Sequence, residues 1–323
     1  MVALFNRGSQ TQDGRDAGSL RERFRAWWDG AEILEPSQEP APAADAESEL
    51  EHAEHDDAPR QYWEPARVRL VQDLWGYGFS SPGGRDHLQT MVNIFGLDPA
   101  MTVLDLGAGL GAAARFMCEK FGGWVTGFEA DEALAEAAMA LSVKAGMGEK
   151  VPINVFDPQA FEHKPKSVDC VFSKEFLFTV RNKPKFLKAV ENLLKLKGQF
   201  LFTDYMLAKP QLKSPVLEEW MAHEPVKAHP WALEDYQDAL ATVRLDVRVT
   251  EDVTETFRAM VIEGWAKYTQ STQRGSVGEK AAPALVDEVE RWTRRIQAID
   301  SGDLKVCRVH AFKKESERMM SDW

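Results

Sequence analysis

A glycine-rich turn, roughly a third of the way along the 323 residues, constrains this chain more than any other stretch. Strand-like residues 103–106 run directly into Gly107, Ala108, Gly109, Leu110 and Gly111, and an apolar segment of helical character follows over 112–121. Glycines at alternate positions let backbone amides approach a ligand closely, and the start of the following helix carries partial positive charge. The turn is therefore typical of a nucleotide-binding site. Which nucleotide it binds is the next question.

Helical and strand-like patterns alternate after the turn, and this alternation predicts the fold class. Strands are expected at 103–106, 124–128, 151–156, 168–173, 199–203, 244–249 and 305–312. Helices are expected at 85–95, 112–121, 132–144, 183–196, 233–242, 254–269 and 283–299. The pattern favours an α/β fold with a doubly wound, mostly parallel, seven-stranded sheet and helical insertions in the C-terminal third. Residues 205–235 are expected to be irregular.

Composition divides the chain into four parts. Residues 1–35 combine a polar start with a short amphipathic helix of Trp and Arg, and 36–60 form an acidic Pro/Ala/Glu linker that is too polar to fold. Residues 61–315 form the globular domain, and 316–323 form a tail. The helix within 19–35 either packs on the domain or makes a peripheral contact with a membrane surface or a protein partner.

Charge and cysteine content exclude several classes of function. The net charge of −12 argues against a nucleic-acid partner, because such proteins usually carry a basic surface. The three cysteines lack metal-site spacing, so we expect buried thiols, a reducing compartment and no metal site. No apolar run is long enough for an integral membrane segment, and no signal peptide is visible, so we expect a cytoplasmic protein. Nothing in the sequence predicts the oligomeric state.

Acidic residues at the ends of three predicted strands narrow the choice of nucleotide. Asp105 precedes the glycines and could orient the turn or meet a ligand ammonium, whereas Glu129 could accept hydrogen bonds from a ribose diol. Asp157 follows the third strand, where it could accept a hydrogen bond from the exocyclic amine of an adenine. A dinucleotide-dependent oxidoreductase also fits the loose glycine pattern, but such an enzyme does not need Asp105.

Together these motifs resemble those of class I S-adenosylmethionine-dependent methyltransferases over about 61–315. VLDLGAGLG is similar to the first motif of that family, GFEAD to the second, FDPQ to the third, and FSKEFLF to the strand-four motif. The resemblance implies S-adenosylmethionine as cofactor and a methyl group transferred to a small-molecule acceptor. The implied cofactor-binding residues in these motifs are Asp105, Gly107, Ala108, Gly109, Gly111, Glu129, Ala130, Asp157, Pro158, Ser173 and Lys174.

Within the family, the chain resembles the small-molecule branch that includes phosphoethanolamine, ubiquinone/menaquinone and sterol methyltransferases. GYGFSSPGG is similar to the lid loop of the phosphoethanolamine enzymes, which gives a lid role to Tyr77, Ser80, Ser81, Gly83 and Gly84. FLFTDY is similar to the end of their fifth strand, which places Tyr205 at the substrate. Two features depart from that branch: residues 176–179 contain no histidine, and 225–231 contain no clear phosphate-binding set.

Candidates for the acceptor side lie at the ends of the fourth and fifth strands and in the segment after them. Tyr205, Glu175 and His229 are the predicted catalytic residues; Asp204 and His223 are weaker candidates. Phe178, Trp220 and Trp231 form either an aromatic wall for a lipid-like or cationic acceptor or part of the core. The acceptor could be an amine, a phosphobase, or a lipid- or quinone-like compound. The alternative is a non-catalytic S-adenosylmethionine-binding module that acts through protein partners.

Overall fold

The computed structural model describes residues 62–272 and 282–314, so the predictions for the amphipathic helix within 19–35, the linker at 36–60 and the tail at 316–323 lie outside the described residues. The strands are β1 (Thr102–Leu106), β2 (Trp124–Glu129), β3 (Ile153–Val155), β4 (Val168–Lys174), β5 (Leu194–Leu207), β6 (Trp231–Ala232), β7 (Leu245–Asp252) and β8 (Leu304–Lys313). The α-helices are α2 (Pro65–Trp75), α3 (Gly84–Val92), α4 (Ala112–Phe121), α5 (Glu132–Lys144), α6 (Lys183–Leu193), α7 (Pro215–Ala222), α8 (Leu233–Thr242), α9 (Thr254–Thr272) and α10 (Ala282–Asp300), with 3-10 turns η1 (Asn93–Phe95) and η2 (Leu177–Thr179).

The strands form one sheet in the order β3-β2-β1-β4-β5-β8-β7, and the two-residue strand β6 pairs with β5 off this path. All pairs from β3 to β5 are parallel, whereas β8 runs antiparallel to both β5 and β7. The α/β class and the mostly parallel sheet are therefore confirmed. In the described residues, no helix has the length and apolar composition that a bilayer-spanning segment needs.

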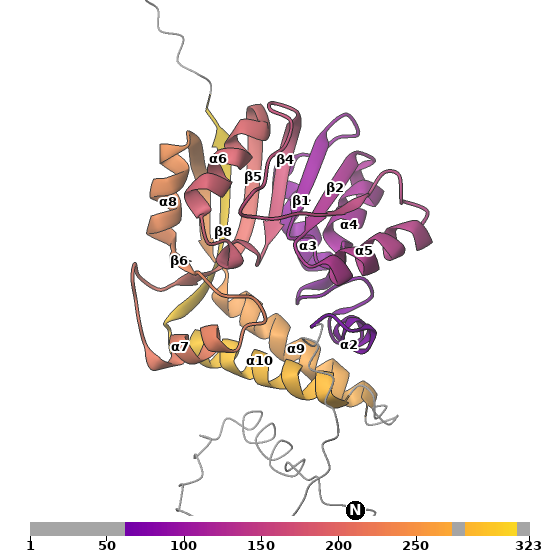
Figure 1. Cartoon of the computed structure of the whole chain (residues 1–323), viewed down its shortest axis with the longest axis vertical. Coiled ribbons are helices and arrows are strands. Elements are labelled where there is room, and N and C mark those ends of the chain that lie inside the picture. The colour runs from indigo at the N-terminus through magenta and orange to yellow at the C-terminus, as the bar shows by residue number, and fades with distance from the viewer. Residues whose placement is uncertain (1–61, 273–281, 315–323) are drawn as a thin grey trace, which may run out of the picture. The chain divides into compact units, whose positions relative to one another are not determined.

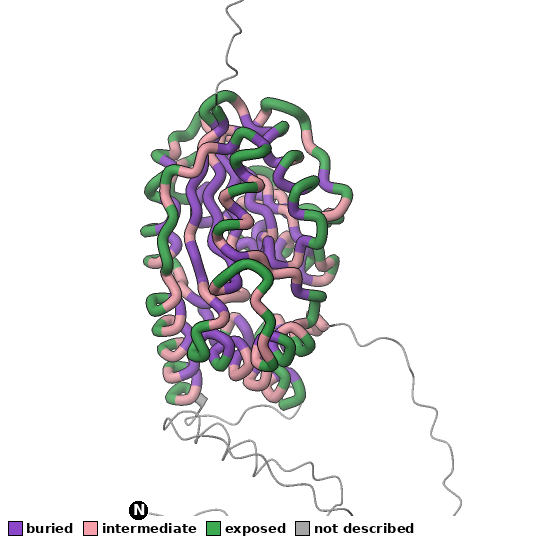
Figure 2. Tube along the Cα trace, turned by 90° about the vertical axis from the view of Figure 1, so that its left-hand side faces the viewer, coloured by how far each residue is buried: buried purple, intermediate pink, exposed green. Residues whose placement is uncertain are grey.

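Helices cover both faces of the sheet, and the alternation of side chains along the strands creates a core on each face. Leu104 and Leu106 pack in the core that contains α6 and α8, whereas Val103 packs in the core that contains α3, α4 and α5. The strands are buried along most of their length, while the covering helices have exposed outer surfaces (Figure 2). Cys118, Cys170 and Cys307 are free and buried, as predicted.

Gly127 allows the turn after β1 to pack against β2 and β3. A Cβ at this position would lie 2.4 Å from Cδ1 of Ile153 in β3 and 3.1 Å from Cβ of Ala108 in the turn. The first distance is shorter than carbon atoms tolerate and the second is tight, so a side chain at 127 would displace the end of the Ile153 side chain and press on Ala108. The helices α2, α7, α9 and α10 gather at the end of the sheet toward which this turn projects (Figure 1).

Several predicted boundaries were wrong. Residues 194–196, predicted as the end of a helix, begin β5, because Leu194 pairs with Val168 of β4 and the backbone leaves the helix there. The third strand is shorter than predicted. The region 205–235 is more ordered than expected: β5 continues to Leu207, and α7 follows with Ser214 as its N-cap and Pro215 in its first turn.

Candidate functional site

A cavity of about 340 Å³ opens at the carboxyl ends of the central parallel strands, where an α/β sheet usually binds its ligand. Its volume lies in the range of small-molecule sites. One part, which we call the cofactor end, is formed by the glycine turn, the end of β2 and residues 78–81 and 84 of the predicted lid. The other part, the acceptor end, is formed by the segment after β4, Tyr205 of β5, residues 224–226 and α10.

Two positions of the glycine turn have no room for a side chain, because neighbouring segments pack directly on its backbone. Gly107 has φ +76°, and a Cβ there would lie 2.3 Å from the ring of Phe176. Gly109 has φ +55°, and a Cβ there would lie 2.3 Å from Oγ of Ser80 in the lid segment. Both conformations favour glycine over residues with a side chain. The turn is therefore packed directly against the lid and the segment after β4.

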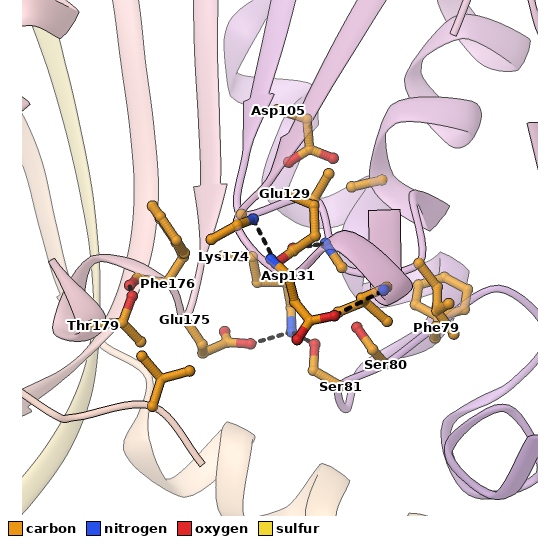
Figure 3. Close-up of a pocket in the computed structure, with 18 of the residues that line it drawn as sticks. Phe79, Ser80, Ser81, Asp105, Glu129, Asp131, Lys174, Glu175, Phe176 and Thr179 are labelled. Atoms are coloured by element: carbon orange, nitrogen blue, oxygen red, sulfur yellow. Dashed lines mark hydrogen bonds and ion pairs between the residues drawn. The ribbon is translucent and has the colours of Figure 1, made fainter. Parts of the chain in front are cut away.

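Glu129 ends β2 and is held in place by backbone amides (Figure 3). Its Oε2 accepts a hydrogen bond from the amide of Gly109 at 2.8 Å, and its Oε1 accepts from the amides of Ala130 and Asp131 at 2.8 and 3.1 Å. Burial raises the pKa of the Glu129 carboxyl, although these three donors lower it. Oε2 accepts one of these three bonds and has a second lone pair, so Glu129 can still accept a hydrogen bond from a ligand hydroxyl.

Asp105 lies near the end of β1, only 1 % exposed, and lines the cofactor end of the cavity. Its Oδ2 has no hydrogen-bond partner in the described residues. Burial, followed by the nearby charge of Glu129, raises the pKa of Asp105 to about 7. Burying a carboxylate without a partner is unfavourable, and a ligand cation at this position would compensate it.

Lys174 and Glu175 join the end of β4 to the lid segment. The Lys174 ammonium forms an ion pair with Glu175 and donates hydrogen bonds to Ser81 Oγ at 2.8 Å and the Pro82 carbonyl at 3.0 Å (Figure 3). Glu175 has φ +45° and accepts a hydrogen bond from Thr203 Oγ1 at 2.8 Å. The two charges lie between the cofactor end and the acceptor end, where they compensate each other.

The acceptor end contains a second ion pair beside Tyr205. Arg295 of α10 donates two hydrogen bonds to the Glu224 carboxylate, at 2.6 and 2.5 Å, and contacts the Tyr205 hydroxyl at 3.4 Å. Burial raises the pKa of Tyr205 well above its usual range, although Arg295 lowers it. Phe178 packs edge-to-face against Tyr205, with the ring centroids 5.1 Å apart.

Most of the sequence-predicted site residues line this one cavity. They are Ser80, Ser81, Gly84, Asp105, Gly107, Ala108, Gly109, Glu129, Ala130, Pro158, Lys174, Glu175 and Tyr205. The remaining ones do not line it: Tyr77, Gly83, Gly111, Asp157, Ser173 and His229. Their predicted roles stay predictions.

The residues away from the cavity have other contacts in this structure. Asp157 is exposed and accepts a hydrogen bond from the amide of Gln159, and Ser173 donates to the Leu106 carbonyl. The ring of Tyr77 lies 5.4 Å from Nζ of Lys144 and is 64 % exposed. Burial and three nearby basic residues lower the pKa of His229. The weaker candidates also lie outside the cavity: Asp204 accepts hydrogen bonds from Phe178 N and Tyr236 Oη, and His223 is exposed beside Glu219.

Sequence reasoning missed the contribution of α10. Arg291 and Arg295 line the cavity, yet they lie more than 65 residues beyond Glu224 in the sequence. Their spacing of four residues places them on one face of a helix. This spacing was the sequence pattern that could have indicated them as a pair. Asp131 and Gln159 also line the cavity and lie in the GFEAD and FDPQ motifs, which was the available signal for them. Glu224 and Trp63 line it as well, and we see no sequence pattern that indicates these two.

Comparison with known proteins gives consistent matches. A family model described as "Methyltransferase domain" matches residues 97–271, more than half of the chain. Phosphoethanolamine N-methyltransferase 3 of Arabidopsis thaliana is 24 % identical over 238 residues, which are 74 % of this chain and 47 % of the relative. Phosphoethanolamine N-methyltransferase of Plasmodium falciparum (isolate 3D7) is 21 % identical over 261 residues, which are 79 % of this chain and 88 % of the relative. The chain thus spans about half the length of the plant relatives.

The fold also matches solved structures. The structure of Haemonchus contortus phosphoethanolamine N-methyltransferase 2 in complex with S-adenosyl-L-methionine superimposes with a TM-score of 0.68 at 23 % identity. The match covers 77 % of this chain and 57 % of that chain. At this identity the likeness establishes the fold.

Proposed function

This chain belongs to the family of methyltransferase domains, and from that premise we propose that it transfers a methyl group from S-adenosylmethionine to a small-molecule acceptor. When bound, S-adenosylmethionine supplies an electrophilic methyl group on a sulfonium sulfur. The protein then has to hold the cofactor, position the nucleophilic atom of the acceptor and take up any proton that the acceptor loses.

The buried carboxylate of Asp105 beside the glycine turn, with no hydrogen-bond partner at Oδ2 in the described residues, is the observation that carries the proposal. An ammonium group, such as that of the methionine part of the cofactor, would neutralise this carboxylate. Glu129 also lines the cofactor end, and its Oε2 has a lone pair for a ribose hydroxyl; Gly107 and Gly109 let Phe176 and Ser80 pack directly on the turn. The residues present therefore fit this cofactor.

Two residues are proposed to act on the acceptor. The Tyr205 hydroxyl, whose raised pKa keeps it protonated, can donate a hydrogen bond to an acceptor atom. Glu175 lies in the strand-four motif and supplies a carboxylate at the acceptor end. Lys174 and Thr203 fix its position. The proposed acceptors are an amine or phosphobase, as in the relatives named above, or a lipid- or quinone-like compound.

Binding of S-adenosylhomocysteine to the full chain, measured by isothermal titration calorimetry, tests this proposal. We expect the wild-type protein to bind this compound and to show no binding of NAD. Glu129→Ala should lower the affinity ten- to a hundred-fold, because a charge-assisted contact with the diol is worth about 1.5–3 kcal/mol. Transfer of a labelled methyl group to a panel of amines, phosphobases and quinols tests catalysis.

Glu132→Ala is the matched control, because Glu132 is an exposed acid in the first turn of α5, three residues further along. It should leave the affinity unchanged. Thermal melting of both variants without ligand separates loss of binding from loss of folding, since Glu129 also accepts three backbone hydrogen bonds. Equal affinities of wild type and Glu129→Ala, or binding of NAD, would contradict the proposal.

A further inference from the structure

Every basic side chain that lines the cavity, within the part of the chain that the structure describes, already has a carboxylate partner. The three are Lys174, Arg291 and Arg295. Lys174 pairs with Glu175, Arg291 pairs with Glu288 at 2.5 Å, and Arg295 pairs with Glu224 at 2.5 Å. The acceptor end therefore has basic residues but no uncompensated cation.

The pair between Arg295 and Glu224 is buried and geometrically complete. The side chains are 9 % and 1 % exposed, and two nitrogens of the guanidinium contact the two carboxylate oxygens. Glu224 also accepts a hydrogen bond from Nε1 of Trp220 at 2.6 Å. Separating such a pair leaves a buried charge without a partner, which is strongly unfavourable. An anionic ligand would have to compete with Glu224 for Arg295.

The charges behind Arg291 are also balanced. Glu288 is fully buried and accepts hydrogen bonds from Arg67 at 2.8 Å and from Arg291 at 2.5 Å. The second terminal nitrogen of Arg67 contacts Asp287 at 2.6 Å. Two arginines therefore face two carboxylates in this cluster. Together with the pairs of Lys174 and Arg295, the charged groups at the acceptor end sum to zero.

Aromatic side chains form the remaining walls. Trp63, Phe176, Phe178 and Tyr205 all line the cavity. Phe178 meets Tyr205 edge-to-face and lies tilted against Trp220, with centroids 5.1 and 6.0 Å apart. Rings arranged in this way favour a flat, apolar ligand, which can stack on one ring and meet the edge of another.

We propose that the acceptor end binds an uncharged aromatic acceptor of the phenol class, and not a phosphate-bearing amine. This inference rests on the proposed function, because it names the class of acceptor for the same site. A phosphate group needs cations that are not already neutralised, and an ammonium group needs a carboxylate that is free. The charge pairs of Lys174, Arg291 and Arg295 leave neither at the acceptor end of the cavity.

Thermal stabilisation of the full chain, saturated with S-adenosylhomocysteine, distinguishes the two classes of acceptor. The probes are phosphoethanolamine, inorganic phosphate and a panel of uncharged phenols. We expect at least one phenol to raise the melting temperature, and neither phosphate compound to change it. Stabilisation by phosphoethanolamine, or by no phenol of the panel, would overturn the inference. If S-adenosylhomocysteine itself does not bind, the proposed function fails instead.

Glu224→Gln makes the test sharper, because it leaves Arg295 without its countercharge and turns the acceptor end positive. We expect inorganic phosphate to bind this variant at least about tenfold more tightly than it binds wild type, a change of one power of ten in the dissociation constant. Glu219→Gln is the matched control: it removes an acid of α7 that is 55 % exposed and paired with Arg294, and phosphate binding should stay as in wild type.

Glu175→Gln provides the same test at the other pair, because it frees Lys174. It replaces Glu224→Gln if that variant does not fold, as judged by its circular dichroism. A folded variant of either kind that gains no phosphate affinity would also overturn the inference, since the guanidinium or ammonium would then be shown not to face the acceptor end.

Discussion

Asp105 differs from the other buried acids of the domain in its lack of a hydrogen-bond partner at one oxygen. Glu129 has three amide donors, and Glu224 and Glu288 each face at least one arginine. Among the side-chain carboxylates of the described residues, Oδ2 of Asp105 is the buried oxygen without a donor. In the protein without ligand, Asp105 therefore gains a proton at a pH at which an exposed aspartate is ionised.

The pKa of Asp105 predicts a pH-dependent cofactor affinity. Its folded-state pKa is about 7, and a ligand ammonium favours the ionised carboxylate, so binding releases a proton below that pH. The affinity for S-adenosylhomocysteine should rise with pH by up to about tenfold per unit below pH 7, and level off above it. In Asp105→Asn the affinity should be weaker and this rise absent. Titration calorimetry at several pH values checks both statements.

The raised pKa of Asp105 makes the ligand-free protein less stable as the pH rises, whereas it makes the cofactor affinity increase. Asp105 ionises near its ordinary value of 3.8 when unfolded, but near 7 when folded. Its contribution to the free energy of unfolding therefore falls as the pH rises between these two values, because the unfolded chain binds fewer protons.

The prediction for cofactor binding is contradicted if Asp105→Asn keeps the pH dependence of cofactor affinity seen in wild type. In that case the group that titrates is not Asp105.

For single residues, the sequence predicts the acids at strand ends better than it predicts contacts between residues that are distant in the chain. Asp105 and Glu129 follow local motifs, and both line the cavity. Arg295 and Glu224 lie 71 residues apart and meet only because α10 crosses the end of the sheet. A charge pair between distant residues leaves no local pattern, so the sequence could not predict that the acceptor end is neutralised.

The elements around the cavity are joined by side chains at their ends. Lys174, at the end of β4, contacts Ser81 and Pro82 of the lid segment, which precedes it by more than 90 residues. Ser80, next to these contacts, packs on Gly109. The lid is therefore held against the glycine turn at one point and against β4 at another.

We predict that Lys174→Met loosens the lid segment. The variant loses two hydrogen bonds to the lid and leaves Glu175 without its ion pair, so amide hydrogen exchange over 78–84 should become faster. Release of S-adenosylhomocysteine should accelerate about tenfold, the effect of losing one or two hydrogen bonds. Lys150→Met, at an exposed lysine, is the control. Unchanged exchange over 78–84 would show that Lys174 does not hold the lid.

The boundaries of the elements show which parts of the secondary structure a local sequence pattern does not predict. The helix at 233–242 follows its sequence pattern and matches α8. By contrast, 194–196 continue a helical pattern but begin β5, because Leu194 pairs with Val168 at the available edge of β4 and this pairing outweighs a weak local preference. The order of the strands, with β8 between β5 and β7, depends on such long-range pairing.

Across the whole molecule, the first and last described helices are connected by buried charges. Arg67 of α2 and Arg291 of α10 both contact Glu288, which is fully buried. Trp75 of α2 also packs against Trp292, with ring centroids 4.8 Å apart. Both Arg67 and α10 lie outside residues 97–271, which the family model matches.

We predict that Glu288→Gln lowers the free energy of unfolding by about 3–5 kcal/mol, because it leaves the buried Arg291 without a countercharge and leaves Arg67 with Asp287 alone. Urea denaturation at neutral pH measures this change. Burial raises the pKa of Glu288, but the two arginines lower it below its usual value, so its stabilising contribution is present above pH 4.5 and is lost as the pH falls below that value.

Glu290→Gln is the control at this scale, because Glu290 lies two residues away and is 44 % exposed, with Arg294 at 3.5 Å. Its removal should change the free energy of unfolding by less than about 1 kcal/mol. Similar losses in the two variants would mean that the buried cluster does not connect α2 to α10.

Gly127 of β2 and Ile153 of β3 restrict which side chains the other position can have. Alanine at this position would overlap Cδ1 of Ile153, whereas valine at 153 lacks that atom. A larger residue at 127 therefore requires a different rotamer or a shorter side chain at 153, and it also meets Cβ of Ala108 at 3.1 Å. Because Ala108 lines the cavity, the choice of side chain at the edge of the sheet affects the position of the glycine turn.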